Sequence, residues 1–204
     1  MKLIPRLILA CMVSAVAPAY AGVVEYQDFN QFQTAAPNGV TETFEGRADP
    51  ASFVDVSNST LGNLSYSANT FIVDSAFDGG GYQWGTGAVL LLDNYGVTTL
   101  SFAPTKSFSA LFGTVIDFGQ NITVDIDNTL FLISTGAFAN WTFYGWVSDT
   151  EFSSISFTST TGLPLLDDVF LGHGGSTGVP EPASLAMLAL GLLGIGAGRR
   201  RQAK

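Results

Sequence analysis

The segment WTFYGWV, at residues 141–147, decides the fold class because its side chains alternate in the manner of a β-strand. In an extended strand, successive side chains point to opposite faces. Positions 141, 143, 145 and 147 therefore share one face, and positions 142, 144 and 146 share the other. The pattern predicts a strand rather than a helix.

Similar short runs rich in Phe, Val, Ile and Thr occur on both sides of this segment, separated by clusters of Gly, Asn, Asp and Pro that favour turns. The strands expected outside it are residues 23–26, 40–46, 52–57, 64–68, 70–73, 88–92, 98–103, 107–116, 122–126, 130–134, 153–158 and 165–171. Strands without intervening helical patterns predict an all-β fold, an antiparallel β-sandwich of the jelly-roll kind. One short N-terminal helix is expected after Asp28, because Gln31 lies at the capping-box distance.

The N-terminus has the three parts of a secretory signal peptide, residues 1–21. Lys2 and Arg6 form the charged region, residues 7–17 the apolar region, and residues 19–21 a small-x-small cleavage site. We therefore expect export through the secretion machinery and cleavage by signal peptidase after Ala21. A lipid-modified cysteine at position 11 is the alternative, although the bulky leucine two residues before it is unfavourable.

The charge of the chain is concentrated between its two ends. Six of the eight basic residues lie in the terminal segments, leaving Arg47 and Lys106, whereas all 17 acidic residues fall between Glu25 and Glu181. The body therefore carries a net charge of −15. Binding to nucleic acid is excluded, because phosphate contacts need a basic surface. Divalent cations and neutral polysaccharides are compatible partners.

The C-terminal tail also has three parts. Pro180, Glu181 and Pro182 come first, and the two prolines separate the rest of the tail from the preceding chain. Residues 183–198 are uncharged and rich in Leu, Ala and Gly, which predicts a hydrophobic helix just under the usual bilayer-spanning length of ~17–25 residues. Residues 199–201 are arginines, which hold that end on the cytoplasmic side.

This tail resembles the PEP-CTERM sorting signal of Gram-negative bacteria. The resemblance implies recognition and cleavage by the membrane enzyme exosortase, a transient stay in the inner membrane, and release or transfer to the cell surface. A plain C-terminal membrane anchor is the alternative. The predicted organisation is thus a signal peptide at 1–21, a β-sandwich domain at 22–172, a Gly-rich linker at 173–178 and the sorting signal at 179–204.

Acidic side chains near both ends of the predicted domain are candidate metal ligands. Glu45 lies in the TFEG segment near its start, and Asp167 and Asp168 lie in its last strand. The first and last strands of a jelly roll are neighbours, so these carboxylates are expected to meet. A cation would relieve their mutual repulsion, and oxygen ligands suit Ca²⁺.

The FEG and DDV segments resemble those of carbohydrate-binding-type jelly rolls, and the resemblance implies a structural calcium held by Glu45 with one or both aspartates. The alternative is that these residues are ordinary polar groups at strand ends.

Two aromatic residues, Tyr82 and Trp84, are the candidate ligand-binding residues, because they lie in a Gly-rich loop and sugars stack on aromatic faces. No catalytic residue is assigned: the one histidine, His173, lies in the linker, and no nucleophile motif accompanies it. We therefore expect a non-enzymatic exported protein of the cell surface or biofilm matrix that binds exopolysaccharide. A purely structural protein without a ligand, or a secreted glycan hydrolase, is the alternative.

Overall fold

The computed structural model describes residues 22–77, 87–93, 95–115, 117–138, 140–159 and 162–172. All of them belong to one compact unit, Ala21–Gly175, and this unit has its own hydrophobic core. Its elements, in chain order, are β1 (Val23–Tyr26), α1 (Phe29–Ala35), β2 (Gly39–Glu42), β3 (Phe53–Asp55), β4 (Thr60–Leu61), β5 (Leu64–Tyr66), β6 (Phe71–Asp74), β7 (Ala88–Leu91), β8 (Val97–Thr114), β9 (Asn121–Ile126), β10 (Thr129–Ser134), β11 (Thr142–Ser159) and β12 (Pro164–Gly172).

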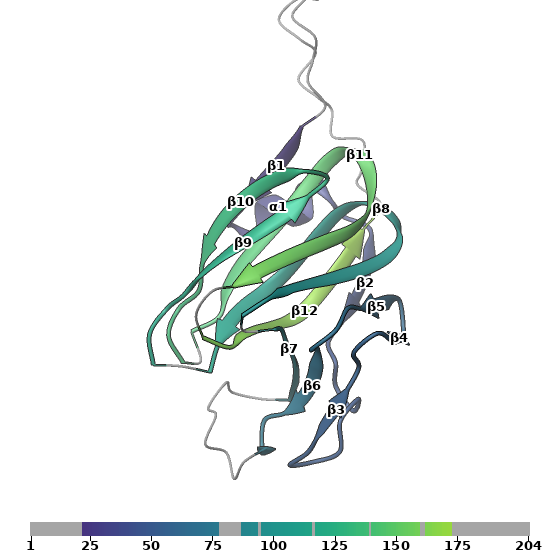
Figure 1. Ribbon diagram of the computed structural model, residues 1–204. Helices are drawn as coiled ribbons and strands as arrows, with labels where there is room; N and C mark the ends of the chain where they lie inside the picture. Colours follow the sequence, from purple (N-terminus) through teal and green to yellow (C-terminus); the bar gives the residue numbers. More distant parts are fainter. Residues whose placement is uncertain are drawn as a thin grey trace, which may run out of the picture. The chain divides into compact units, whose positions relative to one another are not determined.

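Two long strands, β8 and β11, connect the two layers of the sandwich (Figure 1). They pair antiparallel over almost their whole length, with register shifts between Val147 and Ser154. Pro104 lies in β8 opposite these shifts, where its missing N–H costs no ladder hydrogen bond. The pair bends at this point, so each strand contributes one half to each layer.

All strand pairings in the described residues are antiparallel. One layer contains β1, the first half of β11, the second half of β8 and β12, and β12 continues to β2 and to β7, β6 and β3. The other layer contains β10, β9, the second half of β11, the first half of β8, and the β4–β5 hairpin.

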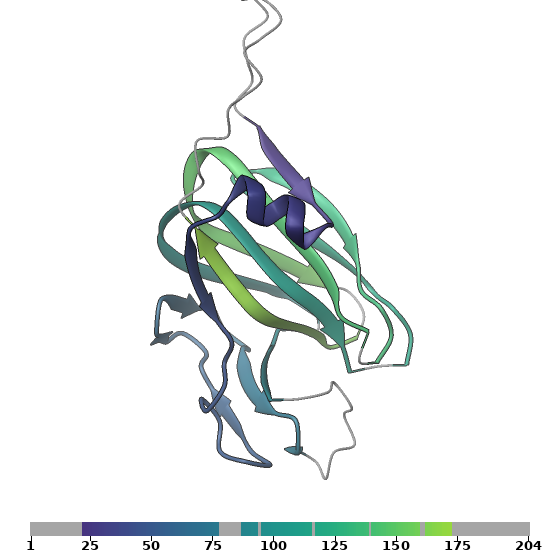
Figure 2. The ribbon, with the colours of Figure 1, turned by 180° about the vertical axis from the view of Figure 1, so that it is seen from behind.

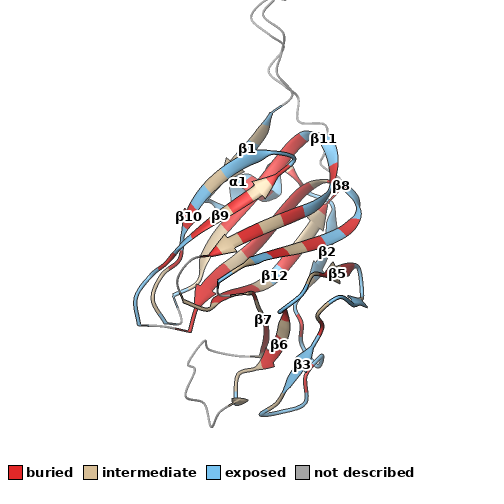
Figure 3. Ribbon diagram, viewed as in Figure 1, coloured by how far each residue is buried: buried red, intermediate tan, exposed pale blue. Residues whose placement is uncertain are grey.

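The core lies between these layers (Figure 3). Phe108, Phe112 and Trp146 come from the halves of β8 and β11 in one layer, and Leu100 and Phe157 come from the halves in the other. The rings of Phe112 and Trp146 meet edge to face at 6.0 Å between centroids. The two strands therefore supply side chains to both walls of the same core.

The helix α1 covers the outer face of the layer that contains β1 (Figure 2). Asp28 caps it by accepting a hydrogen bond from the backbone N–H of Gln31 at 2.9 Å. The buried ring of Phe32 packs directly on Gly145 in β11, where a Cβ would collide with it. The glycine of the WTFYGWV segment therefore allows the helix to pack closely on the sheet.

The predicted all-β fold, an antiparallel sandwich with one short N-terminal helix, is confirmed. The alternation of residues 141–147 is also confirmed, since Phe143 and Val147 pack beneath α1 whereas Tyr144 and Trp146 lie in the core. Two details of the prediction are wrong. The two strands expected at 98–103 and 107–116 are replaced by a single strand, β8, which ends at Thr114, and those expected at 141–147 and 153–158 are replaced by β11, which begins at Thr142.

Within the described ranges, no helix combines the length and apolar character needed to cross a bilayer. The hydrophobic helix expected at 183–198 lies outside those ranges, as do the signal peptide at 1–21 and the linker at 173–178.

Candidate functional site

The strand β12 changes its edge partner part of the way along its length. Residues 169–172 pair with β2, whereas Leu165 and Leu166 pair with β7. Asp167 and Asp168 lie between these pairings, and the register with β8 shifts at the same place. Asp168 has a φ of 49°, which is consistent with a β-bulge. The bulge leaves a short stretch of the β12 edge that carries two carboxylates.

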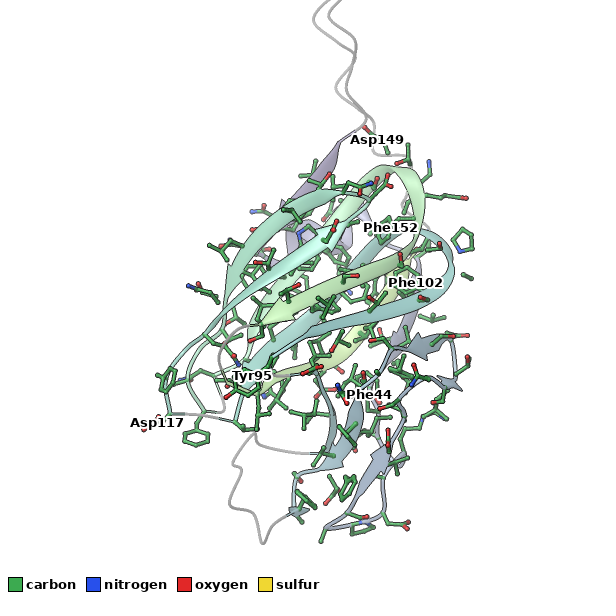
Figure 4. The ribbon with its side chains drawn as sticks, in the orientation of Figure 1. Phe44, Tyr95, Phe102, Asp117, Asp149 and Phe152 are labelled. Atoms are coloured by element: carbon green, nitrogen blue, oxygen red, sulfur yellow. The ribbon has the colours of Figure 1, made fainter. Side chains whose placement is uncertain are left out.

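The turn after β2 brings Glu45 to this stretch. Phe44 has a φ of 60° and a fully buried side chain, which anchors the turn in the core (Figure 4). Glu42 forms an ion pair with Arg47 at 2.9 Å and accepts a hydrogen bond from the backbone N–H of Phe44 at 3.2 Å. The Glu45 carboxylate then packs against Gly87, next to β7, so closely that a Cβ would not fit there.

Asp167 has the most strongly perturbed carboxyl group of this region. Its pKa is raised from an ordinary 3.8 to about 7, mainly by burial and to a smaller extent by the negative charges of Asp168 and Glu45. A hydrogen bond of 2.7 Å from the backbone N–H of Asp168 to Asp167 Oδ1 acts in the opposite direction. Glu45 and Asp168 are therefore close enough to Asp167 to act on its ionisation.

Glu45, Asp167 and Asp168 are the calcium ligands that the sequence predicts. Their oxygen donors have the chemistry that Ca²⁺ prefers, and the carboxyl group of Asp167 is partly buried next to two other carboxylates. In the described part of the chain, however, no group of three or more Asp, Glu, His or Cys side chains has a geometry that could hold a metal ion. Calcium binding at this edge stays a prediction.

One end of the sandwich exposes aromatic side chains from three loops. Tyr95 lies between β7 and β8, Phe118 between β8 and β9, and Phe138 between β10 and β11. Their exposed fractions are 78%, 57% and 38%. Tyr95 and Asp117 lie at this end, opposite to Asp149 (Figure 4). Tyr95, Phe118 and Phe138 together are called the aromatic end.

Short contacts hold these loops in place. Asp93 accepts a hydrogen bond from the backbone N–H of Tyr95 at 3.1 Å and another from the side-chain amide of Asn69 at 3.0 Å. Gly119, next to Phe118, packs on the backbone of Thr135 with no space for a Cβ. Thr135 in turn donates its backbone N–H to the carbonyl of Gln120 at 2.9 Å. The rings are therefore presented on defined turns.

The sequence prediction missed the aromatic end, although a signal for it was present. Tyr95 stands between Asn94 and Gly96, and Phe118 stands between Asp117 and Gly119. An aromatic residue flanked by turn-forming residues on both sides has no strand neighbours to bury it, which predicts exposure at the tip of a loop.

The predicted ligand-binding residues Tyr82 and Trp84 lie outside the described residues, and so do Pro180, Glu181 and Pro182 of the sorting motif. Two further aromatic residues that sugars could have used, Tyr144 and Trp146, are core residues with exposed fractions of 7% and 0%.

A separate pocket of about 210 Å³ lies on the outer face of the layer that contains β12. Phe53, half exposed, forms edge-to-face pairs with Phe71 and Phe77 at its wall. The complete lining is Phe53, Phe71, Val73, Phe77, Leu91, Val115, Leu163 and Leu165. An entirely apolar lining suits an apolar group and offers no partners to sugar hydroxyls.

Comparison with known proteins identifies the C-terminal tail. Residues 178–201 match the PEP-CTERM protein-sorting motif. This match confirms the sorting signal that the sequence predicts around Pro180, Glu181 and Pro182. The motif implies export, sorting by an exosortase and a destination at the cell surface. No curated protein matches the chain.

Several solved structures are distantly similar to the chain. An exo-β-1,3-galactanase from Phanerochaete chrysosporium, with β-1,3-galactotriose, has 14% identity and a TM-score of 0.36 over 60% of this chain, which spans only 29% of that protein. A family 29 carbohydrate-binding module has 12% identity and a TM-score of 0.36, covering 65% of this chain and 99% of the module. A family 6 module has 15% identity and a TM-score of 0.34, covering 63% and 97%.

The raised pKa of Asp167 predicts a pH dependence of stability in metal-free buffer. The folded chain binds more protons than the unfolded chain between about pH 4 and pH 7, so this group makes the free energy of unfolding fall as the pH rises through that window. Asp167→Asn should remove this contribution and be more stable than the wild type at pH 8, as measured by urea unfolding in EDTA.

Asp55→Asn is the matched control. Hydrogen bonds from Ser57 lower the pKa of exposed Asp55, so its contribution has the opposite sign and is lost as the pH falls. An Asp167→Asn variant that follows the wild-type pH profile throughout would show that Asp167 is ionised normally in the folded state.

Proposed function

We propose that this chain is an exosortase-sorted protein of the cell surface or biofilm matrix, and that its sandwich binds an extracellular polysaccharide without cleaving it. The aromatic end carries the proposal. Tyr95, Phe118 and Phe138 expose their rings on three loops at one end of the sandwich. They present apolar ring faces on loops that also carry polar backbone and side-chain groups, the combination by which proteins hold sugar rings.

The charge of the body narrows the class of polysaccharide. Two basic and 17 acidic residues lie between Glu25 and Glu181, so an anionic polymer would be repelled. The proposed ligand is therefore a neutral polysaccharide. A repeating polymer engages many copies of a surface protein at once, which compensates for weak binding at each site.

The predicted loop residues Tyr82 and Trp84 extend the same proposal. They share with the aromatic end the chemistry of stacking on a sugar face. Substitution of each residue separately distinguishes a contribution of Tyr82 and Trp84 from one of Tyr95 and Phe118.

The second part of the proposal is a structural calcium ion at the β12 edge, held by Glu45 and by Asp167, Asp168 or both. A bound Ca²⁺ would supply positive charge beside the partly buried carboxyl group of Asp167 and offset its repulsion by Asp168 and Glu45. The ion would link the turn after β2 to the last strand. Its role is structural, because the rings proposed to bind polysaccharide lie on other elements.

Polysaccharide binding is tested with the unit Ala21–Gly175 and the exopolysaccharide of the producing cells, by affinity electrophoresis. Tyr95→Ala should weaken retention about fivefold, because an aromatic stacking contact is worth roughly 1 kcal/mol. Phe29→Ala is the matched control, since Phe29 is 51% exposed but lies on α1, away from the aromatic end.

Equal retention of the Tyr95→Ala and Phe29→Ala variants would remove the aromatic end from the binding site. No retention of the wild-type protein would leave a purely structural surface protein. Release of soluble sugars from the polymer during the assay would contradict the non-enzymatic part of the proposal and favour a hydrolase.

Calcium binding is tested by thermal and urea unfolding in Ca²⁺ and in EDTA. A Ca²⁺ concentration of ~1,000 times its Kd should stabilise the fold by ~4 kcal/mol. Glu45→Gln should abolish this gain, whereas Glu151→Gln, at an exposed carboxylate on β11, should preserve it. Identical unfolding curves of the wild type in the two buffers would eliminate the calcium site, and the polysaccharide assay would be unaffected by that result.

A further inference from the structure

The strand β10 forms a free edge of the sheet (Figure 1). Its sequence, TLFLIS at residues 129–134, contains no charged residue and no proline. Leu130 and Leu132 are 67% and 72% exposed, and Figure 3 shows β10 as a largely exposed strand. Its six residues pair with β9 in unbroken register, so no bulge turns the edge away from a partner.

The other edge strands of the described sheet carry the protection that β10 lacks. β1 contains Glu25, β2 contains Glu42 and β3 contains Asp55, whereas β4 is only two residues long. Charged side chains and short length are the usual devices that keep sheet edges from pairing with other chains. Among the edges of that sheet, β10 alone has neither a charged side chain nor a short length to prevent pairing with a further strand.

The turn before β10 determines which of its backbone groups are available. Asp127 and Asn128 have φ values of 50° and 62° and connect the paired residues Ile126 and Thr129, as in a two-residue type I′ hairpin. Thr129 therefore exchanges hydrogen bonds with β9, and so do residues 131 and 133. The N–H and C=O groups of residues 130, 132 and 134 point to the free edge.

A single side chain caps one end of this edge. The Tyr144 hydroxyl accepts a hydrogen bond from the backbone N–H of Ser134 at 3.2 Å and donates one to the carbonyl of Ser134 at 3.0 Å. This confirms the outward direction of the Ser134 groups. The outward N–H and C=O groups of Leu130 and Leu132 have no such cap in the described structure.

We propose that β10 pairs with the β10 strand of a second copy of this chain, antiparallel, about a two-fold axis at Phe131. In this register Leu130 lies opposite the partner's Leu132, and Leu132 lies opposite the partner's Leu130. Each pair exchanges two backbone hydrogen bonds, so all four outward groups of each strand are satisfied. The four leucine side chains meet on the same outer face of the joined sheet.

The protein is acidic, so two copies repel each other, and this repulsion is weakest at an edge strand that carries no charge. The chain contains no charged residue from 128 to 148. The nearest carboxylate on the neighbouring strand is Asp125, opposite Leu130. Strand spacing and rise place it about 16 Å from the partner's Asp125. This exceeds the Debye length of ~8 Å at physiological salt, so repulsion between the two copies is screened.

The pairing is weak for two isolated copies, because edge-to-edge contact buries far less than the ~1,600 Å² of a standard interface. It becomes significant where copies are concentrated, as they are on a cell surface, since each copy then pairs at a high local concentration. Pairing of β10 edges therefore associates neighbouring copies side by side, and this association does not require a polysaccharide.

Sedimentation equilibrium of Ala21–Gly175, at protein concentrations up to about 1 mM and in about 0.5 M salt to screen the acidic body, tests the pairing. The wild type should show a monomer–dimer equilibrium. Leu132→Lys should weaken it by at least about tenfold, because the lysine charge would be set against a leucine of the partner. Val97→Lys is the matched control, an exposed aliphatic residue at 55% away from β10, and should behave as the wild type.

A wild type that stays monomeric over the whole range would overturn the proposal, as would equal behaviour of Leu132→Lys and Val97→Lys. Both positions are exposed, so both variants should keep the wild-type melting temperature.

Cysteine cross-linking tests the register. Leu130→Cys combined with Leu132→Cys places two thiols across each pair, within disulfide reach. Either single variant leaves its thiol about 8 Å from the same residue of the partner, too far for a bridge. The compact unit contains no other cysteine. Mild oxidation should link the double variant into dimers and leave the single variants largely monomeric; equal linking of all three would contradict the register.

Discussion

The bend of the β8–β11 pair is the constraint on which the rest of the structure depends. Both strands are 18 residues long, and both pass from one layer of the sandwich to the other. Because they remain paired on each side of the bend, the two layers are joined by continuous backbone and by a common core. β1 and β9 pair with β11, and β5 and β12 pair with β8. The remaining strands continue the sheet outward from these four.

The bend also determines where the candidate sites lie. Val97 and Thr114, the two ends of β8, emerge at the same end of the sandwich, with Thr158 paired to Val97 and Pro164 paired to Thr114. The loops that carry Tyr95, Phe118 and Phe138 start or finish there. The carboxylate site has a different origin, because it arises where β12 passes from β2 to β7 and a bulge interrupts the edge. The two sites are therefore built on separate elements and can be tested separately.

Much of the fold follows from local sequence patterns. Alternation in WTFYGWV predicts both the strand and its two faces, and Asp28 with Gln31 predicts the start of α1. The continuity of β8 and β11 was not predictable in the same way. Pro104 resembles a strand break in the sequence, but it lies at the bend, where a missing N–H is tolerated. Only the pairing of distant segments distinguishes a corner in one strand from a turn between two.

In the candidate sites, too, some features follow from local sequence and others depend on the tertiary structure. The sorting motif is linear, so the residues around Pro180 to Pro182 could be recognised without a structure. Trp146 and Tyr144 could not be assigned to core or surface by residue type, because burial depends on which face meets the opposite layer. The proximity of Glu45 to Asp167 was expected from the neighbouring first and last strands. The partial burial that raises the pKa of Asp167 depends on the bulge in β12, and no local sequence pattern predicts that bulge.

Native-state hydrogen exchange of Ala21–Gly175 tests most directly whether the bent pair makes the two layers one cooperative structure. We predict that amide protons in residues 98–102 and 108–112, on opposite sides of the bend in β8, exchange with the same free energy, equal to that of global unfolding. Two distinct free energies, with one half of β8 opening while the other half stays protected, would contradict this cooperativity. In that case the layers would be separate units joined by a flexible corner, and the shared core would not be the source of stability.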